Sequence, residues 1–353
     1  MKIHALASCG QNLTKLSEII GNTPLVELVS AANGSRLLLK LEQFNPTGSA
    51  KIRMAKAMLD DAEAQGLLKP GGWVVESTSG NTGVGLAMLC AERGYRFTAL
   101  VDNHAAKEKI SNMKSFGAEV ICVSEQGSEQ LATQVRDNLA QTMAAEQGAY
   151  WTAQHKNFAN SRGYVALAQE LVTDVGKDIT HLVAAVGTGG SICGTTRALR
   201  DLGCHQFNVI GVEPEGSVIF GGPGKPYHQS GTGTPQGAEI GRVIEYGLID
   251  TGIKVSDQAA FNTARYLAKN HALMVGGSAG GVIYQALQQL KTAPANSTLV
   301  ALVCDGGEKY LDTVFNDEWM HKHQLIDTAV EDELATLFQQ LCANTSLPKK
   351  SAI

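Results

Sequence analysis

The sequence contains no cysteine or histidine pattern that would hold a metal or a disulfide framework. Its 353 residues include 7 cysteines, an odd number, and no two of them are spaced as Cys-x-x-Cys. Such scattered cysteines are typical of small buried side chains in a reducing compartment. The 9 histidines include no His-Glu-x-x-His pair, so we expect no catalytic metal.

Charged residues are also scarce, and long apolar runs are missing. Charged side chains make up 18% of the chain and give a formal net charge of -5, unlike the basic surface of a nucleic-acid-binding protein. No apolar run approaches the length of a membrane span, and the N-terminus has no apolar core like that of a signal peptide. These absences predict a cytoplasmic protein without a nucleic-acid or membrane partner.

Glycine, in contrast, is abundant. The chain has 38 glycines and 9 prolines but no low-complexity tract, which indicates many tight loops within a folded protein. The length is typical of two domains, each large enough to bury its own core.

Short apolar runs alternate with helical patterns along the chain. We expect strands at residues 25–29, 36–41, 73–76, 96–101, 119–123, 181–186, 208–213 and 298–304. We expect helices at residues 13–20, 84–93, 107–116, 129–146, 159–175, 192–202, 257–270 and 280–290, and another that begins near Lys51. This alternation predicts an α/β fold in which mostly parallel sheets have helices on both faces.

Lys51 occupies a position that alters the chemistry of an amine. The turn sequence Asn45-Pro-Thr-Gly48 precedes it, Ser49 is a favourable helix N-cap, and a helical apolar pattern follows. Lys51 is thereby predicted to lie in the first helical turn, where the positive end of the helix dipole favours the neutral amine. A neutral amine is what a Schiff-base lysine requires. On this stretch alone, an ordinary solvated lysine is still the stronger interpretation.

A polar loop, Ser77-Thr-Ser-Gly-Asn-Thr-Gly83, follows the strand at residues 73–76 and precedes a helix. Its hydroxyls, amide and glycines can hold a carboxylate through hydroxyl and backbone N–H groups without a counter-charge. A helix cap would need only one of these hydroxyls, so we favour a binding function.

A glycine-rich loop, Gly187-Thr-Gly-Gly-Ser191, lies between another apolar strand and a helix. Glycines permit close approach of the backbone to a ligand, and a helix N-terminus favours a phosphate. The loop is not a dinucleotide fingerprint, because Ile192 stands where the last glycine is required. By itself it is equally typical of a phosphate loop and of an ordinary turn.

Gly276-Gly-Ser-Ala-Gly280 has the Gly-x-Ser-x-Gly pattern of a hydrolase nucleophile elbow, with Ser278 as the nucleophile. Asp305 and either His321 or His323 follow in the order that α/β-hydrolases use. Both histidines, however, lie in a polar helical stretch, and a hydrolase would leave the earlier loops without a function. A serine hydrolase is therefore kept as the alternative from another mechanistic class.

Six motifs, in their order along the chain, resemble those of the cysteine synthase family. They are Asn45–Arg53, Ser77–Gly83, Gly187–Ser191, Val212–Pro214, Gly276–Gly280 and Asp305–Leu311. The resemblance covers roughly residues 12–320. It implies a pyridoxal 5'-phosphate enzyme of fold type II, the tryptophan-synthase-β-like fold, with two three-layer αβα domains. It also implies a homodimer.

The resemblance assigns roles to individual residues. Lys51 would form the Schiff base with pyridoxal phosphate, Asn81 would bond the ring oxygen, and Ser278 would face the pyridine nitrogen. The residues expected to hold the cofactor phosphate are Gly187, Thr188, Gly189, Gly190 and Ser191. The residues expected to grip the substrate carboxylate are Thr78, Ser79, Thr82 and Gln154, with Asn81 beside them.

A division into domains is implied as well. Residues 1–41 would pack partly on the C-terminal domain, and residues 42–155 would form the smaller domain that carries Lys51. Residues 156–326 would form the larger domain that binds the cofactor phosphate. The charged, helix-prone residues 327–353 would be a peripheral tail.

Three stretches resemble one branch of the family, which joins O-phospho-L-serine to L-glutamate. They are Gly216–Gly221, Ala149–Trp151 and Lys309–Trp319. The likeness implies a β-replacement through an aminoacrylate that gives N-(2-amino-2-carboxyethyl)-L-glutamate, a precursor of L-2,3-diaminopropionate in siderophore biosynthesis. A cysteine synthase that uses sulfide is the alternative within the family.

Three positions depart from the family pattern. Ile52 replaces an acidic residue after the lysine, and Cys304 replaces a proline. Gly187 is the cysteine-synthase residue at a position where the diaminopropionate branch can carry serine. The leaving group of the serine ester, phosphate or acetate, therefore stays open.

Overall fold

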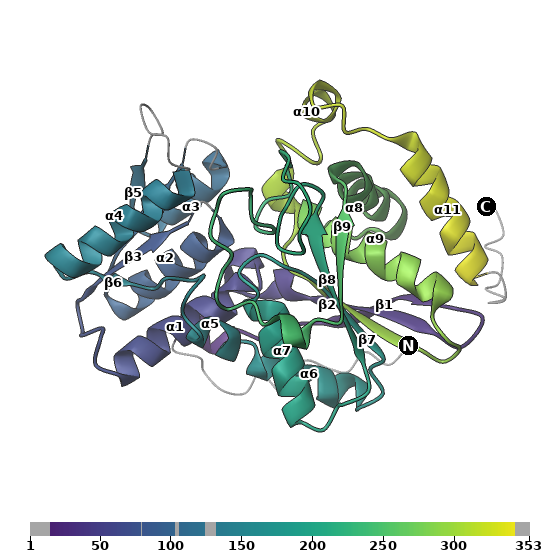
Figure 1. Cartoon of the computed structure of the whole chain (residues 1–353), viewed down its shortest axis with the longest axis horizontal. Helices are drawn as coiled ribbons and strands as arrows, with labels where there is room; N and C mark the ends of the chain where they lie inside the picture. Colours follow the sequence, from purple (N-terminus) through teal and green to yellow (C-terminus); the bar gives the residue numbers. More distant parts are fainter. Residues whose placement is uncertain (1–14, 79, 103–105, 124–131, 343–353) are drawn as a thin grey trace.

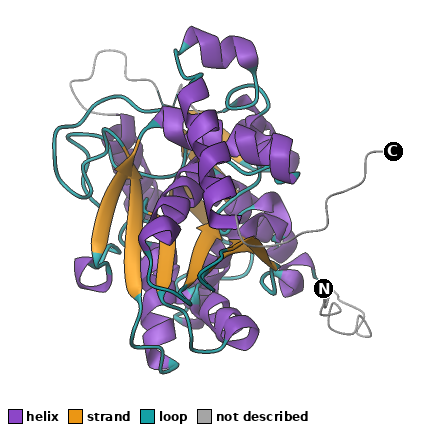
Figure 2. Ribbon diagram, turned by 90° about the vertical axis from the view of Figure 1, so that its right-hand side faces the viewer, coloured by secondary structure: helices purple, strands orange, loops and turns teal. Residues whose placement is uncertain are grey.

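The computed structural model describes residues 15–78, 80–102, 106–123 and 132–342. The chain forms two β-sheets, and helices cover both faces of each sheet (Figure 1, Figure 2). The predicted α/β fold with mostly parallel sheets is confirmed.

The larger sheet has six strands and is parallel except at one edge. In spatial order the strands are β1 (Leu25–Ser30), β2 (Arg36–Leu41), β10 (Thr298–Val303), β7 (His181–Ala185), β8 (Asn208–Pro214) and β9 (Thr251–Val255). β1 is antiparallel to β2, whereas all other neighbours are parallel. The smaller sheet is wholly parallel, in the order β5 (Glu119–Cys122), β4 (Arg96–Val101), β3 (Trp73–Ser77) and β6 (Tyr150–Trp151).

The helices fall into two groups along the chain. Those that pack on the smaller sheet are α1 (Lys51–Ala64), α2 (Asn81–Arg93), α3 (Lys107–Ser115) and α4 (Ala132–Gln147). The later ones are α5 (Ala159–Arg162), α6 (Val165–Val175), α7 (Gly190–Asp201), α8 (Asp257–His271), α9 (Gly277–Thr292), α10 (Asp317–Lys322) and α11 (Thr328–Cys342). None of the helices in the described part of the chain combines the length and hydropathy needed to span a bilayer.

Strand β2 lies inside the larger sheet because its side chains are apolar on both faces. Leu37 and Leu39 point into the cluster formed with α8 and α9, and Leu38 points into the cluster on the opposite face, formed with α6 and α7. Alternate side chains of a strand project to opposite faces, so a continuous apolar run needs helices on both sides. The parallel pairing of Arg36–Leu41 with Thr298–Val303 supplies that position.

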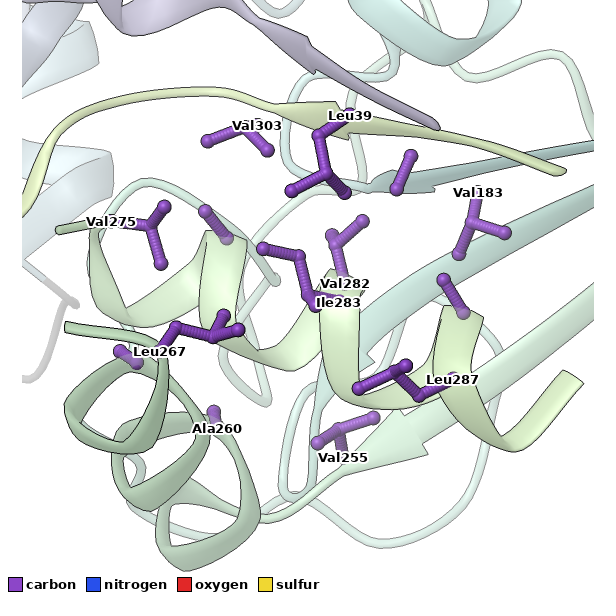
Figure 3. Close-up of a cluster of buried hydrophobic side chains, with 14 of the residues drawn as sticks. Leu39, Val183, Val255, Ala260, Leu267, Val275, Val282, Ile283, Leu287 and Val303 are labelled. Atoms are coloured by element: carbon purple, nitrogen blue, oxygen red, sulfur yellow. The ribbon is translucent and has the colours of Figure 1, made fainter. Parts of the chain in front are cut away.

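The main core lies between the larger sheet and helices α8 and α9 (Figure 3). Val282 and Ile283 of α9 pack against Leu39 and Val183 of the sheet. The two helices approach closely at Gly280, where an added Cβ would lie 2.1 Å from the carbonyl oxygen of Ala260. The absence of a side chain there therefore sets the spacing of α8 and α9.

Helix α11 also contributes to this core. Its buried face carries Val330, Leu334 and Leu337, and its opposite face exposes acidic side chains such as Asp332. The amphipathic pattern buries one face of the helix against α8. Residues 328–342 of the segment that we expected to be a peripheral tail thus take part in the hydrophobic core.

Several local predictions differ from the structure. The helix expected over residues 159–175 is two helices, α5 and α6, separated by Gly163 and Tyr164. Gly163 lies against the backbone of α1, where an added Cβ would meet the Arg53 carbonyl oxygen at 2.7 Å. Strand β9 was not predicted, because its Thr-Gly-Ile-Lys-Val sequence is too short and too polar to form an apolar run.

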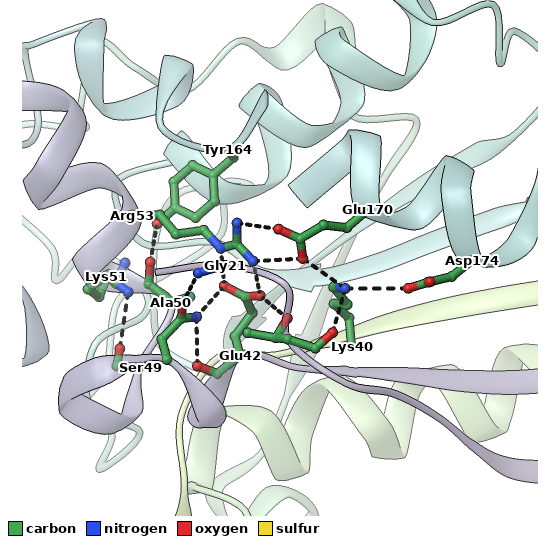
Figure 4. A network of polar contacts seen from close by, with 12 residues as sticks. Gly21, Lys40, Glu42, Ser49, Ala50, Lys51, Arg53, Tyr164, Glu170 and Asp174 are labelled. Atoms are coloured by element: carbon green, nitrogen blue, oxygen red, sulfur yellow. Dashed lines mark hydrogen bonds and ion pairs between the residues drawn. The ribbon is translucent and has the colours of Figure 1, made fainter. Parts of the chain in front are cut away.

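A buried ionic network fixes the chain on both sides of Lys51 (Figure 4). The guanidinium of Arg53 donates two hydrogen bonds to Glu42, at 2.7 and 2.8 Å, and two to Glu170 of α6, at 2.8 and 3.0 Å. Burial would raise the pKa of Glu170, but hydrogen bonds from Arg53 and Lys40 instead lower it to about 2. The Glu170 carboxylate is therefore charged at neutral pH, and these hydrogen bonds tie the start of α1 to α6 and to the segment that follows β2.

Replacement of Arg53 by methionine should destabilise the protein strongly. The Arg53→Met variant leaves the Glu42 carboxylate buried without its cation, and we expect the free energy of unfolding to fall by about 3–5 kcal/mol. Denaturant unfolding followed by circular dichroism measures the change. Arg162→Met is the matched control, because Arg162 pairs with Asp61 at the surface and should contribute less than about 1 kcal/mol. Equal losses in the two variants would contradict a stabilising role for the network.

Candidate active site

The candidate site is a cavity of about 400 Å³ lined by residues from both sheets. Ser77 and Thr78 stand at the carboxyl end of β3, Gly187 follows β7, and Cys304 and Asp305 follow β10. Ligands of parallel α/β sheets bind beyond the carboxyl ends of the strands. The volume of the cavity is within the range of small-molecule sites.

Four helices begin at this cavity. Lys51 is the first residue of α1, Asn81 the first of α2, Gly190 the first of α7, and Ser278 the second of α9. Three of the expected loops are therefore shorter than predicted, because their final residues already form a helical turn. Helix N-termini present unpaired N–H groups and a partial positive charge, which favours anionic groups in the cavity.

Lys51 lies in the first turn of α1, as predicted. The Ser49 hydroxyl accepts a hydrogen bond from the Lys51 backbone N–H at 3.1 Å, although Ala50 is the residue at the cap position. The amine lines the cavity and has no hydrogen bond or ion pair among the described residues. Burial lowers its pKa, opposed in part by nearby Cys304 and Asp305. Burial thus favours the neutral form of an amine that lines the cavity.

The residues predicted to grip a carboxylate lie together beside α2. The Thr82 hydroxyl donates to Gln154 Oε1 at 2.8 Å, and both residues line the cavity. Thr78 Oγ1 accepts from the Gly83 N–H at 3.1 Å and so also caps α2. Its O–H donor is left for a ligand. Ser79 lies outside the described residues.

Asn81 is held by two charged groups from the other side of the cavity. Its Nδ2 donates to Asp305 at 2.7 Å, and its Oδ1 accepts from Lys309 at 3.1 Å. Lys309 also donates to the carbonyl oxygens of Thr47 and Gly48, at 2.7 and 2.9 Å, just before the α1 helix. One Nδ2 hydrogen of Asn81 is unused by these contacts, so the predicted bond to a ring oxygen stays a prediction.

The glycine-rich loop fits a phosphate group. Gly187, Thr188 and Ser191 line the cavity, whereas Gly189 and Gly190 are not among its lining residues. Gly189 has a φ of 87°, and a Cβ there would lie 2.6 Å from the Ile244 side chain. The loop contains two hydroxyls, a helix N-terminus and no acidic side chain, which is a suitable donor set for an anion.

Ser278 does not have the neighbours of a hydrolase nucleophile. Its hydroxyl lies 3.3 Å from the Cys304 sulfur, at the position where the family pattern has proline. His323 packs instead on His228 and Trp319, with ring centroids 4.6 and 4.5 Å apart. Burial raises the pKa of the Cys304 thiol to about 12, so this neighbour is neutral. These contacts do not form a Ser-His-Asp arrangement.

Comparison with known proteins agrees with this donor set. Residues 16–305 match the family described as pyridoxal-phosphate dependent enzyme. A Sinorhizobium fredii protein, provisionally named a cysteine synthase, is 46% identical over 323 residues, which cover 91% of this chain and 96% of that protein. The chain belongs to the cysteine synthase family of pyridoxal-phosphate-dependent enzymes.

Two solved structures of this family show how its products vary. O-ureido-L-serine synthase has a TM-score of 0.79 at 31% identity, covering 88% of this chain and 100% of that one. The O-acetylserine-dependent cystathionine β-synthase of Helicobacter pylori has a TM-score of 0.78 at 30% identity, covering 86% and 98%. As a family member, the present enzyme uses pyridoxal phosphate and catalyses replacement at the β-carbon of an amino acid.

Glu76 is a buried acid that the sequence analysis did not single out, and it contacts Gln154, one of the residues predicted to bind the substrate carboxylate. It accepts from the Thr152 hydroxyl, and from the backbone and side-chain N–H groups of Gln154 at 3.2 and 3.4 Å. Burial raises the pKa of Glu76 to about 8, against these hydrogen bonds. The only signal in the sequence is an acidic residue at the end of an apolar strand.

His155 lines the cavity and was also not singled out by the sequence analysis. Its Nδ1 is buried and has no hydrogen-bond partner among the described residues. Burial lowers its pKa to about 4, with Lys51, Arg136 and Lys156 adding to the decrease against the effect of Asp137. The imidazole is therefore neutral at physiological pH.

Glu76 should give the enzyme a stability that falls with rising pH. The unfolded carboxyl loses its proton near pH 4.5, whereas the folded one keeps it to about pH 8. The folded state binds the extra proton between these values, so the free energy of unfolding decreases across this window. Glu76→Gln resembles the protonated acid and should remove that part of the decrease.

Denaturant unfolding of both proteins between pH 5 and about 9 tests this expectation. The variant should gain stability relative to the wild type as the pH rises. Glu27→Gln, on the exposed strand β1, is the matched control for loss of a carboxylate. A difference between Glu76→Gln and wild type that does not change with pH would show that Glu76 is ionised in the folded protein.

Proposed function

We propose that this enzyme replaces the leaving group of an activated L-serine with the amine of L-glutamate. The activated serine is O-phospho-L-serine or O-acetyl-L-serine, and the product is N-(2-amino-2-carboxyethyl)-L-glutamate, a precursor of L-2,3-diaminopropionate. The observation that carries the choice of nucleophile is the presence of two cationic side chains, Arg136 and Lys156, on the cavity wall.

The residues of the site would have separate roles in the reaction. When bound, pyridoxal phosphate supplies an electron sink for negative charge at the substrate α-carbon. Lys51 would hold the cofactor through its amine and, once released, would take the α-proton at Nζ, and burial lowers the pKa of this amine. Thr82 and Gln154 orient the substrate carboxylate beside the start of α2.

A dicarboxylate nucleophile needs cations that sulfide does not. Arg136 of α4 forms an ion pair with Asp102 at 3.1 Å, and Lys156 forms one with Glu239 at 3.2 Å. Arginine has five N–H donors, so a ligand carboxylate can share the Arg136 guanidinium with Asp102. Arg136 and Lys156 would together match the two carboxylates of glutamate.

Two of the stretches that resemble the glutamate-using branch contact residues that line the same cavity. Ser217 accepts from the Thr234 N–H at 2.9 Å and so positions the cavity-lining loop at residues 230–235. Tyr310 donates to Asp305 at 2.6 Å, behind Asn81. The resemblance therefore concerns residues that shape the site rather than a distant surface.

A cysteine synthase that uses sulfide is the second candidate. Gly187 favours it, because a larger residue would need more space: an added Cβ would lie 2.8 Å from the Gly231 carbonyl oxygen. The provisional name of the Sinorhizobium fredii relative points the same way. A serine hydrolase has no such support, given the contacts of Ser278 with Cys304.

Competition between nucleophiles tests the proposal directly. The holoenzyme is given each serine ester in turn, with L-glutamate, with sulfide or with both, and products are quantified by mass spectrometry. We expect the glutamate adduct to form faster than cysteine with at least one ester. Lys51→Ala should lose turnover and the visible absorbance of the lysine-bound cofactor. Turnover with glutamate that never exceeds turnover with sulfide would assign the enzyme as a cysteine synthase instead.

Arg136→Gln should separate the two nucleophiles. Loss of hydrogen bonds to a charged group predicts that the KM for glutamate rises roughly ten- to a hundredfold, while the KM for sulfide changes little. Steady-state kinetics with each nucleophile measure the change. Arg197→Gln is the matched control, because Arg197 pairs with Glu245 at the surface. An equal rise of both KM values would show that Arg136 supports the fold rather than glutamate binding.

A further inference from the structure

Asn160 lies between the two halves of the site and has no role in the reaction described above. It is fully buried in the short helix α5 and does not line the cavity. Its Nδ2 donates to the Gln154 carbonyl oxygen at 2.8 Å and to Thr188 Oγ1 at 3.0 Å. Both hydrogens of the amide are thereby used, so Asn160 has no donor left for a ligand.

These bonds determine what the Thr188 hydroxyl can do. Thr188 Oγ1 accepts from Asn160 and also from the Gly190 N–H at 3.4 Å. A hydroxyl has two acceptor positions and one donor, and here both acceptor positions are occupied. Because Thr188 lines the cavity, its O–H can only donate, and an anionic oxygen is the partner that this arrangement suits.

The loop is also shaped around the Asn160 amide. An added Cβ at Gly190 would lie 1.8 Å from Asn160 Oδ1, so only glycine fits there. Oδ1 is buried without a hydrogen-bond partner among the described residues. Burial of an unpaired carbonyl is unfavourable, which indicates that the position is retained for its two N–H donors.

We infer that Asn160 is a positioning residue that couples the two subsites, orienting Thr188 toward the cofactor phosphate and Gln154 toward the substrate carboxylate. This inference rests on the proposed function, which assigns those two ligands to Thr188 and Gln154. It adds a residue that touches neither ligand but acts on both binding groups.

Binding of two cofactor forms to the apoenzyme provides the test. Dissociation constants are measured by absorbance for pyridoxal phosphate and for pyridoxal, which lacks the phosphate. Asn160→Ala should weaken the binding of pyridoxal phosphate roughly two- to tenfold and leave the binding of pyridoxal nearly unchanged. Thr188→Val should also weaken the binding of pyridoxal phosphate but not of pyridoxal. The double variant should lose no more affinity for pyridoxal phosphate than Thr188→Val alone, because Asn160 acts through the Thr188 hydroxyl.

Steady-state kinetics of the holoenzyme at saturating cofactor test the second contact. The KM for the serine ester should rise in Asn160→Ala but not in Thr188→Val. The matched control is Asn157→Ala, since Asn157 donates to the Thr152 carbonyl oxygen at 3.1 Å in the same loop and does not reach Thr188. If Asn160→Ala does not fold, Gly190→Ala, which displaces the same amide, should show the same phosphate-specific loss.

The inference would be overturned by equal weakening of pyridoxal phosphate and pyridoxal binding, by additive losses in the double variant, or by a KM for the serine ester that does not change in Asn160→Ala. A wild-type enzyme that binds the two cofactor forms equally would also remove the phosphate role of the loop, on which the proposed function depends. Preference for the phosphate in the wild type, retained in every variant, would overturn the role of Asn160 alone.

Discussion

The pairing of one buried arginine with two carboxylates, one buried and one partly buried, determines where the candidate lysine lies. Arg53 follows Lys51 by two residues, and its guanidinium is held by Glu42 before the helix and by Glu170 from α6. A planar guanidinium matches two carboxylates in a fixed geometry, which a lysine ammonium would not do. The start of α1 is thereby fixed against the larger sheet, and Met54 and Met58 pack into that sheet's core, although another face of the helix, with Ile52, Ala55 and Leu59, packs with the smaller sheet.

Local features of the fold could be read from the sequence because they depend on neighbouring residues. Apolar runs located most of the strands, and turn chemistry placed Lys51 in the first helical turn. The beginnings of α2, α7 and α9 were missed, since glycines and hydroxyls within a first helical turn look like loop residues in sequence. Strand β9 was missed because its pairing with β8, rather than its own pattern, makes it a strand.

The supporting residues of the site could not be predicted, because their partners are distant in sequence or become buried only in the fold. The Glu76 carboxyl is hydrogen-bonded by Thr152 and Gln154, and the Asn160 amide acts on the site through its hydrogen bond to Thr188. Family resemblance located the groups expected to touch ligands. It did not indicate which side chains hold those groups in place, and those depend on packing between segments.

The position of β2 also affects how the protein is made. Its parallel partner β10 begins at Thr298, so the larger sheet cannot close during synthesis until almost all of the described chain has emerged. Residues 51–151 are contiguous and can assemble around the smaller sheet earlier, since contacts close in sequence form first. Meanwhile the apolar residues Leu37–Leu39 lack their sheet neighbour and are exposed to association with other chains. The candidate lysine is therefore made early, and its surroundings are completed among the last.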